Sequence, residues 1–425
     1  MCDRIPCINE ECQSTILQST ADRTGGYCMP CHQAIKRKEQ EEFIRKNRKD
    51  INLYEGVNDP VEILKTMHTP KKYNPLEKYI KYEKSMEEMY ILLSEEDKQR
   101  MKAYVLTLIK DEEIEKAQDI LLPLVCFSSA NVNECLKALI EMGECYPEIV
   151  FKDASTYIRD ILISQVEQET NCLNLNHALR ALAWIGDKKV VDLFNKWRRK
   201  PPKWAGKLYV PPEQYSFEAG WELTEEGERR DLFYKDCYVI EKNKSSEQEP
   251  ITFLEKLDDK CEWCGGDLTN LFNFDLTNSL FDFIKYNMKK LSIPTCHVCN
   301  CYGPIYIDID NSGTAHWSEL NSKPEYLGDV SDDESIILKN PLRISKVKRS
   351  CFHASSELLE TTFSQVGGHP TWIQDAEYPK CPKCSNHMKF IGQIDWADIE
   401  EYGEGVYHAF VCEECNIAAT NYQQS

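Results

Sequence analysis

The chain has 425 residues, which is enough for two to four domains. Its 51 Lys and Arg residues against 70 Asp and Glu residues give a formal net charge of -19, which disfavours nucleic-acid binding and suits a basic protein partner. The N-terminus has no apolar signal core and no run approaches the roughly 18 apolar residues of a membrane span, so together with the cysteine usage the sequence predicts a cytoplasmic protein.

Residues 1–34 contain the first of three sets of four cysteines. Cys7 and Cys12 are separated by four residues, and Cys28 and Cys31 by two. In a long chain without a secretory signal, such spacing is typical of zinc ligands rather than disulfides. We predict a small zinc ribbon, or a treble-clef-like knuckle, whose folding depends on the metal. Cys2 and His32 are alternative ligands.

Residues 35–84 are predicted to form a charged helix and a linker. The stretch 34–50 has many charged and few apolar residues, which favours a solvated helix over a basic arm for nucleic acid, because Glu residues interrupt the basic ones. Three prolines then indicate loops, with one short helix over 61–67.

Residues 85–200 show repeated apolar spacing of the helical kind and predict a helical domain. Ser94 begins one helix, Gly186 ends another and Asp187 caps the next. The run ALRALAWIGD resembles a HEAT-like repeat, which implies a short array of stacked helical hairpins that serves as a binding surface. We expect His177 to be packed or exposed rather than a ligand, and four cysteines to be buried thiols: Cys126, Cys135, Cys145 and Cys172.

Residues 201–425 are predicted to form a β-rich domain, set off by the pairs Pro201-Pro202 and Pro211-Pro212. The second cysteine set lies here, with a Cys-x-x-Cys pair at each end of an interval of 31 residues: Cys261, Cys264, Cys296 and Cys299. His297 and Cys301 adjoin the second pair and are alternative ligands. Residues 311–350 are predicted to form loops and edge strands, with an acidic stretch over 328–334.

The third set closes the chain, again as two Cys-x-x-Cys pairs, now separated by 27 residues: Cys381, Cys384, Cys412 and Cys415. Two apolar runs between the pairs, MKFIGQI and GVYHAF, predict a hairpin with one knuckle at each end, which is a zinc ribbon. We expect four side chains to form its apolar support: Trp372, Phe390, Ile394 and Phe410. Gly367 and Gly368 predict a turn that positions Trp372.

The same C-terminal region carries a family resemblance. The run GGHPTWIQ, the pair CPKC, the run MKFIGQ and the closing Cys-x-x-Cys pair together resemble the YwqG-like bacterial family and, more distantly, the programmed cell death protein 2 family. The first family implies a β-rich fold. The second implies binding and escorting of other proteins. The resemblance covers about the last 60 to 75 residues.

The predicted fold class is therefore α+β and multidomain: an N-terminal zinc ribbon, a central HEAT-like helical array and a C-terminal β-rich domain with two zinc-ribbon-like sites. Four thiolates fill the tetrahedron around zinc, so we predict that the zinc of all three sites has a structural rather than a catalytic role. We expect a non-enzymatic protein-binding module that neutralises a toxin, as immunity proteins do, or escorts a basic client.

Two alternatives stay open. The first is nucleic-acid or translation-linked binding through the N-terminal ribbon. The second is an uncatalogued hydrolase, for example one with Cys351 as nucleophile beside His353 or His369. The sequence does not decide between zinc and iron.

Overall fold

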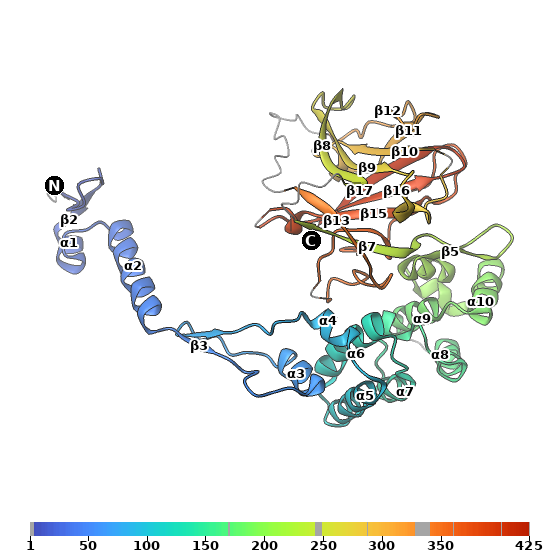
Figure 1. The fold of residues 1–425 in the computed structure, drawn as a ribbon, viewed down its shortest axis with the longest axis horizontal. Coiled ribbons are helices and arrows are strands. Elements are labelled where there is room, and N and C mark those ends of the chain that lie inside the picture. The colour runs from blue at the N-terminus through green and yellow to red at the C-terminus, as the bar shows by residue number, and fades with distance from the viewer. Residues whose placement is uncertain are drawn as a thin grey trace. The chain divides into compact units, whose positions relative to one another are not determined.

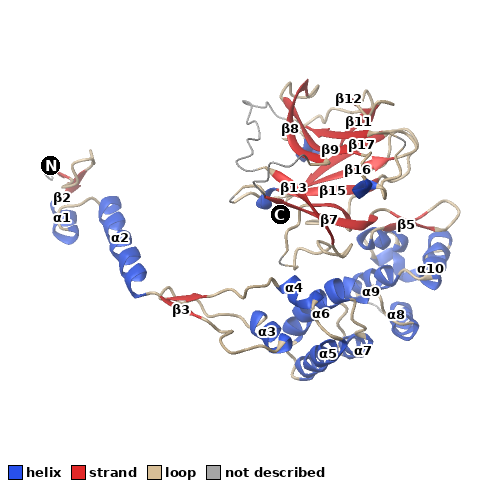
Figure 2. Ribbon diagram, in the orientation of Figure 1, coloured by secondary structure: helices blue, strands red, loops and turns tan. Residues whose placement is uncertain are grey.

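The computed structural model describes residues 4–168, 171–242, 249–286, 288–327, 341–359, 361–400 and 402–424. The chain divides into two compact units, Met1–Ser85 and Met86–Ser425. In the second unit helices come first along the chain and strands follow (Figures 1 and 2). The acidic stretch over 328–334 lies outside the described residues. Among those residues no helix combines the length and the apolar character needed to cross a bilayer.

From residue 4 onward the first unit contains short strands and three helices. They are β1 (Arg4–Pro6), β2 (Thr15–Leu17), α1 (Gln18–Thr24), α2 (Met29–Asn47), β3 (Lys49–Ile51), α3 (Pro60–Met67) and β4 (Glu77–Tyr79). α2 has no buried residue, as expected for a solvated helix. The predicted boundary at residue 34 is wrong because α2 runs through it, so the second cysteine pair and the charged stretch form one element. α3 confirms the predicted short helix.

The second unit begins with helices, as predicted. They are α4 (Met86–Ile91), α5 (Glu95–Lys110), α6 (Ile114–Ser128), α7 (Asn133–Glu141), the 3-10 turn η1 (Glu148–Phe151), α8 (Thr156–Gln168), α9 (Cys172–Ile185) and α10 (Lys188–Arg199). Ser94 and Asp97 form a capping box at the start of α5. Gly186 ends α9 in the left-handed conformation, and Asp187 caps α10 through the Val190 amide. The three predicted helix boundaries are therefore confirmed.

The helical part and the β part of this unit pack together through a short connection. It consists of η2 (Lys203–Lys207), η3 (Pro212–Ala219), β5 (Trp221–Leu223) and β6 (Arg229–Asp231). Trp221 is fully buried, and its indole N–H donates to the Ala183 carbonyl of α9 at 2.8 Å. Arg229 donates to the Gly186 carbonyl at 2.8 Å. These bonds fix the end of α9 against the β5–β6 hairpin.

An eight-stranded antiparallel sheet forms the centre of the β part, in the order β12-β11-β17-β16-β15-β14-β7-β13. Its strands are β7 (Tyr234–Lys242), β11 (Ile305–Ile309), β12 (Ala315–Trp317), β13 (Leu342–Lys348), β14 (Gln365–Gly368), β15 (Lys389–Asp395), β16 (Val406–Cys412) and β17 (Ile417–Gln423). β12 and β13 are its two edges, which confirms the edge strands expected within 311–350.

Each face of this sheet is buried in a different core. On β16, Tyr407, Ala409 and Val411 face one core, while Phe410 and Cys412 face the other, as the two-residue period of a strand requires. A second sheet, in the order β10-β9-β8, packs on the first face (Figure 1). Its strands are β8 (Ile251–Lys260), β9 (Asp267–Asp275) and β10 (Lys290–Thr295).

The predicted apolar support of the third cysteine set is correct for three of its four side chains, and a β-bulge explains the exception. Phe390 and Phe410 are buried beside Cys381 and Cys412, and Trp372 packs on the same cluster. Ile394 instead faces the opposite core. A regular strand would place Phe390 and Ile394 on one face, but the β15–β16 register shifts between Phe390 and Gly392, which exchanges the faces.

The four cysteines of the helices, expected to be buried thiols, differ from one another. Cys126 and Cys135 are fully buried, as predicted. Cys145 and Cys172 are only partly buried: Cys145 lies in the connection between α7 and η1, and Cys172 is the first residue of α9. For these two the prediction is wrong.

Candidate metal centres

Three groups of four cysteines come together in the structure, and they are the three sets predicted from spacing. The first contains Cys7, Cys12, Cys28 and Cys31, the second Cys261, Cys264, Cys296 and Cys299, and the third Cys381, Cys384, Cys412 and Cys415. Within each group all four Sγ atoms lie within 4.8 Å of one another. His32, His297 and Cys301 are not members, and Cys2 lies outside the described residues.

The distances between sulfur atoms fit a tetrahedral metal ion. With a Zn–S bond of about 2.3 Å, the edge of the tetrahedron is roughly 3.8 Å, whereas a disulfide brings two sulfurs to about 2.05 Å. The Sγ–Sγ distance is 3.7 Å for Cys12–Cys28, 3.8 Å for Cys261–Cys299 and 3.7 Å for Cys384–Cys412. All three groups therefore fit four-thiolate zinc sites.

The first site is built from a hairpin and the start of a helix. β1 and β2 pair and place Cys7 and Cys12 in their connection, while Cys28 is the N-cap residue of α2. The Cys28 N–H donates to Cys7 Sγ at 3.2 Å and lowers the pKa of the Cys7 thiol. Hydrogen bonds from Ser14 lower the pKa of Cys12 to about 6. A second pair on a helix corresponds to the treble-clef-like alternative rather than to a ribbon.

The second site joins two knuckles from the smaller sheet. Cys261 follows β8, and Cys296 follows β10. In the first knuckle the Gly265 N–H donates to the Cys261 carbonyl at 2.8 Å, and the Gly266 N–H reaches Cys264 Sγ at 3.4 Å. Gly265 has φ +78°, a left-handed turn that glycine adopts without strain. Three of the four thiols are buried.

The third site lies at the end of the β16–β17 hairpin. Cys412 is the last residue of β16, and Cys415 lies in the turn before β17. The other pair precedes β15, so the hairpin β15–β16 holds one knuckle at each end, as predicted for a ribbon. The Ser385 N–H donates to the Cys381 carbonyl at 2.8 Å, which closes the first knuckle.

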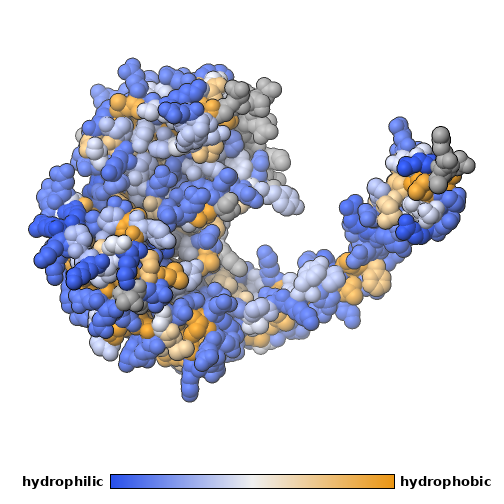
Figure 3. Space-filling view, turned by 180° about the vertical axis from the view of Figure 1, so that it is seen from behind, coloured by the Kyte–Doolittle hydropathy of each residue, from blue (hydrophilic) through white to orange (hydrophobic). Residues whose placement is uncertain are grey.

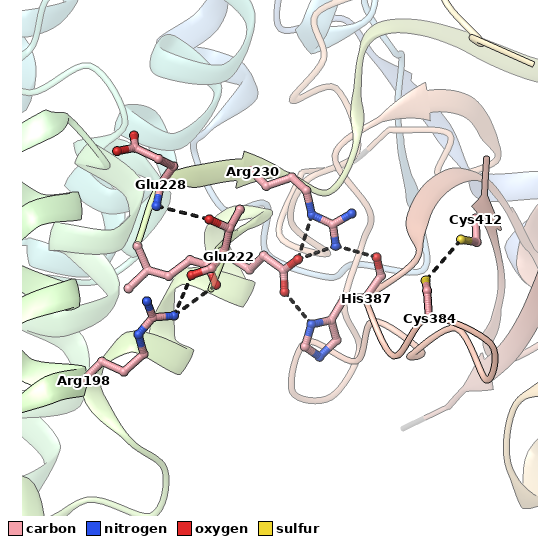
Figure 4. A network of polar contacts seen from close by, with 9 residues as sticks. Arg198, Glu222, Glu228, Arg230, Cys384, His387 and Cys412 are labelled. Carbon is pink, nitrogen blue, oxygen red and sulfur yellow. Dashed lines mark hydrogen bonds and ion pairs between the residues drawn. The ribbon is translucent and has the colours of Figure 1, made fainter. Parts of the chain in front are cut away.

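A polar network attaches the third site to the helical part (Figure 4). His387 follows Cys384 by three residues, and its Nδ1 pairs with a Glu222 carboxylate oxygen. Arg230 donates to Glu222 at 2.8 Å and to the His387 carbonyl at 2.7 Å. Arg198 of α10 donates to the Thr224 carbonyl at 2.8 Å. Glu222 and His387 are 165 positions apart, so no spacing signal in the sequence pointed to this network.

Both histidines proposed as a base for Cys351 have their two ring nitrogens engaged by other groups. His353 is buried, with Nδ1 against a Glu87 oxygen at 2.9 Å and Nε2 against the Thr362 carbonyl at 3.0 Å. His369 has both nitrogens against backbone carbonyls, those of Pro370 and Glu218. Burial also raises the pKa of the Cys351 thiol, which disfavours the thiolate that a nucleophile needs.

Comparison with known proteins gives one informative result. No family model matches the chain, and no solved structure matches it. The uncharacterized protein YpfL of Salmonella typhimurium is 38% identical over 430 residues, an alignment that covers 100% of both chains. The chain belongs to the YpfL family. Because the relative is uncharacterized, membership of the family supplies no activity for the three cysteine groups.

The metal content of this YpfL-family protein is the first testable consequence. We expect native mass spectrometry with elemental analysis of freshly purified protein to give three zinc ions per chain, one for each closed tetrad. Fewer ions would mean that a cysteine group does not bind metal. Iron in place of zinc would contradict the assignment of the metal.

A buried histidine beside the third site predicts a pH dependence of stability. His408 is fully buried on β16, its Nε2 lies 2.8 Å from the Thr371 carbonyl, and burial lowers its pKa from 6.5 to about 4. Between these values the unfolded chain binds more protons, so the free energy of unfolding falls as the pH falls, by roughly 3 kcal/mol once His408 is protonated.

Nuclear magnetic resonance titration checks this prediction. The imidazole signals of His408, assigned with a His408→Gln variant, should not change between pH 7 and 5 in the folded protein. A titration midpoint near the ordinary value of 6.5 would contradict it.

Proposed function

We propose that the chain is a non-enzymatic protein-binding module whose folded state depends on three structural zinc ions and whose partner is basic. Its role would be to neutralise a toxin, as an immunity protein does, or to escort a client, in the cytoplasm. The HEAT-like character of α5 to α10 and the YwqG-like character of the C-terminal region belong to the same proposal.

The distribution of charge carries this proposal. Residues 1–85 contain slightly more basic than acidic residues, so the whole net negative charge of the chain belongs to Met86–Ser425. Hydrophilic side chains dominate the face shown in Figure 3. An acidic surface attracts a basic partner and raises its association rate. The closed tetrads give the metal no open position for a substrate.

Affinity purification tests the proposal. The full chain, tagged and expressed in its native host, should retain a specific protein with an excess of Lys and Arg, and this retention should weaken as the salt concentration rises. A variant that lacks the third site, Cys384→Ser, is the control for dependence on the fold. Recovery of no specific protein from the native host would count against the proposal.

Nucleic-acid binding by the first unit is the second candidate. Its support is the basic excess of residues 1–85 together with the exposed helix α2, where Lys36 and Arg37 have side chains 65% and 76% exposed. Both side chains pair with Glu residues of the same helix, which weakens the case. Fluorescence anisotropy should show binding of RNA or DNA whose association constant, on a logarithmic scale, falls linearly with the logarithm of the salt concentration. Negligible binding at low salt would remove this candidate.

A further inference from the structure

Two adjoining cavities lie beside α9 in the second unit. One has a volume of about 240 Å³ and the other about 220 Å³. Arg180 and Glu218 line both, so the two cavities adjoin at these side chains and are here together called the α9 cleft. Its further walls come from η1, from the residues before β15 and from the loop that contains Ser355 and Glu357.

The walls of the α9 cleft are held by bonds that do not involve a ligand. The Thr371 N–H donates to Gln393 of β15 at 2.9 Å, and the Ile373 N–H donates to Gln423 of β17 at 3.1 Å. These two bonds fix Trp372, which lines the cleft and whose ring lies against His408 with centroids 4.8 Å apart. The GGHPTWIQ run thus supplies one wall of a preformed cleft.

The polar lining is strongly acidic. Arg180 is the single guanidinium among the described lining residues of the two cavities. Four carboxylates also line them: Glu148, Glu218, Glu357 and Asp375. Arg180 lies 3.7 Å from Glu148 and 3.6 Å from Asp375, so one cation is shared between two acids. Glu148 is 9% exposed and also pairs with His177 at 2.7 Å. Burial raises the pKa of Glu218, although the nearby Arg180 guanidinium acts in the opposite direction.

Apolar side chains surround this acidic lining and are exposed to solvent. Tyr209 is 92% exposed, Leu358 47%, Tyr146 41% and Val210 40%, and all four line the α9 cleft. Exposed aromatic side chains near a pocket are typical of the centres of protein interfaces. Aromatic faces also attract guanidinium and ammonium groups. The rim therefore favours a protein segment over a small free ion.

We propose that the α9 cleft binds an arginine or lysine side chain of a protein partner, with the carboxylates around the cation and the exposed aromatic rim against the partner's backbone. The inference deepens the proposed function and rests on it. Free arginine or a polyamine carries the same cation but would leave Tyr209 and Leu358 uncovered.

A peptide-binding experiment with charge-matched variants tests the proposal. The probe is a short fluorescein-labelled peptide of alternating Gly and Arg residues, measured by anisotropy at about 0.15 M salt. The cleft variant combines Glu357→Gln, Asp375→Asn and Tyr209→Ala, all exposed positions whose change does not endanger folding. The control variant combines Asp258→Asn, Asp259→Asn and Tyr326→Ala, which removes the same charges and an exposed ring elsewhere.

We expect the cleft variant to bind the peptide at least about tenfold more weakly than the wild type, with the control variant unchanged. The same peptide with citrulline in place of arginine should not bind. Equal affinities for the two variants, or no binding by the wild type, would overturn the proposal. Spermidine or arginine methyl ester binding as tightly as the peptide would overturn the assignment to a protein segment.

The affinity purification separates this inference from the proposed function. If the wild type retains a partner and the cleft variant retains it equally, the α9 cleft is not the site, while the proposed function stands. If the wild type retains no partner, the proposed function fails whatever the peptide shows.

Discussion

Replacement of Cys384 by Ser should remove one zinc ion per chain and unfold the third site. Cys384 Sγ lies 3.7 Å from Cys412 Sγ, and the two knuckles flank the hairpin β15–β16 in the middle of the large sheet. Metal binding by four thiolates supplies folding free energy on the order of 10 kcal/mol in small zinc domains, as much as the stability of a typical domain. The loss should therefore extend into the sheet rather than stay local.

The matched control is Cys301→Ser, because Cys301 is exposed and belongs to none of the three groups. Zinc content is measured by native mass spectrometry and stability by scanning calorimetry. We expect two ions and a markedly lower transition temperature for Cys384→Ser, and likewise for Cys412→Ser. An unchanged zinc content and melting profile would show that these thiols do not hold a metal.

Replacement of Gly367 by Ala should destabilise the protein by at least about 3 kcal/mol, through left-handed strain and steric overlap together. Gly367 has φ +70° on β14, and an added Cβ would lie 2.0 Å from the Asp236 carbonyl oxygen of β7. β14 lies inside the sheet, between β15 and β7, so neither strand can move away without breaking its other pairings.

Gly206→Ala is the control for this glycine, because nothing lies within 4 Å of an added Cβ at that position. Urea denaturation measures the free energy of unfolding of both variants under the same buffer conditions. We expect Gly206→Ala to unfold at nearly the wild-type urea concentration and Gly367→Ala at a clearly lower one. Equal midpoints would mean that the close approach of β14 to β7 does not restrict this position.

The sequence predicted the metal groups because a Cys-x-x-Cys knuckle is a local structure. Two ligands three positions apart are brought together by one turn, so their spacing can be read directly. The helix boundaries at Ser94 and Asp187 were predictable for the same reason, since a cap depends on residues within one turn. How these elements pack against one another depends on residues that are far apart in the sequence.

Three features escaped prediction because they depend on distant partners. The bulge between Phe390 and Gly392 is defined only by the pairing of β15 with β16. The network of Glu222 and His387 joins elements that no spacing relates. The α9 cleft likewise gathers Arg180, Glu218 and the residues around Trp372 only after the helical and β parts pack together.

The strand order has a consequence for the synthesis of the protein. β17 lies between β11 and β16 in the interior of the sheet, and β7 pairs with β13 and β14 rather than with its neighbours in sequence. A ribosome-bound chain that lacks residues 417–423 therefore exposes unpaired strands on both sides of the missing one. The helices α5 to α10 pack against near neighbours in sequence and can form during elongation, whereas the large sheet can be completed only after Ile417–Gln423 has left the exit tunnel.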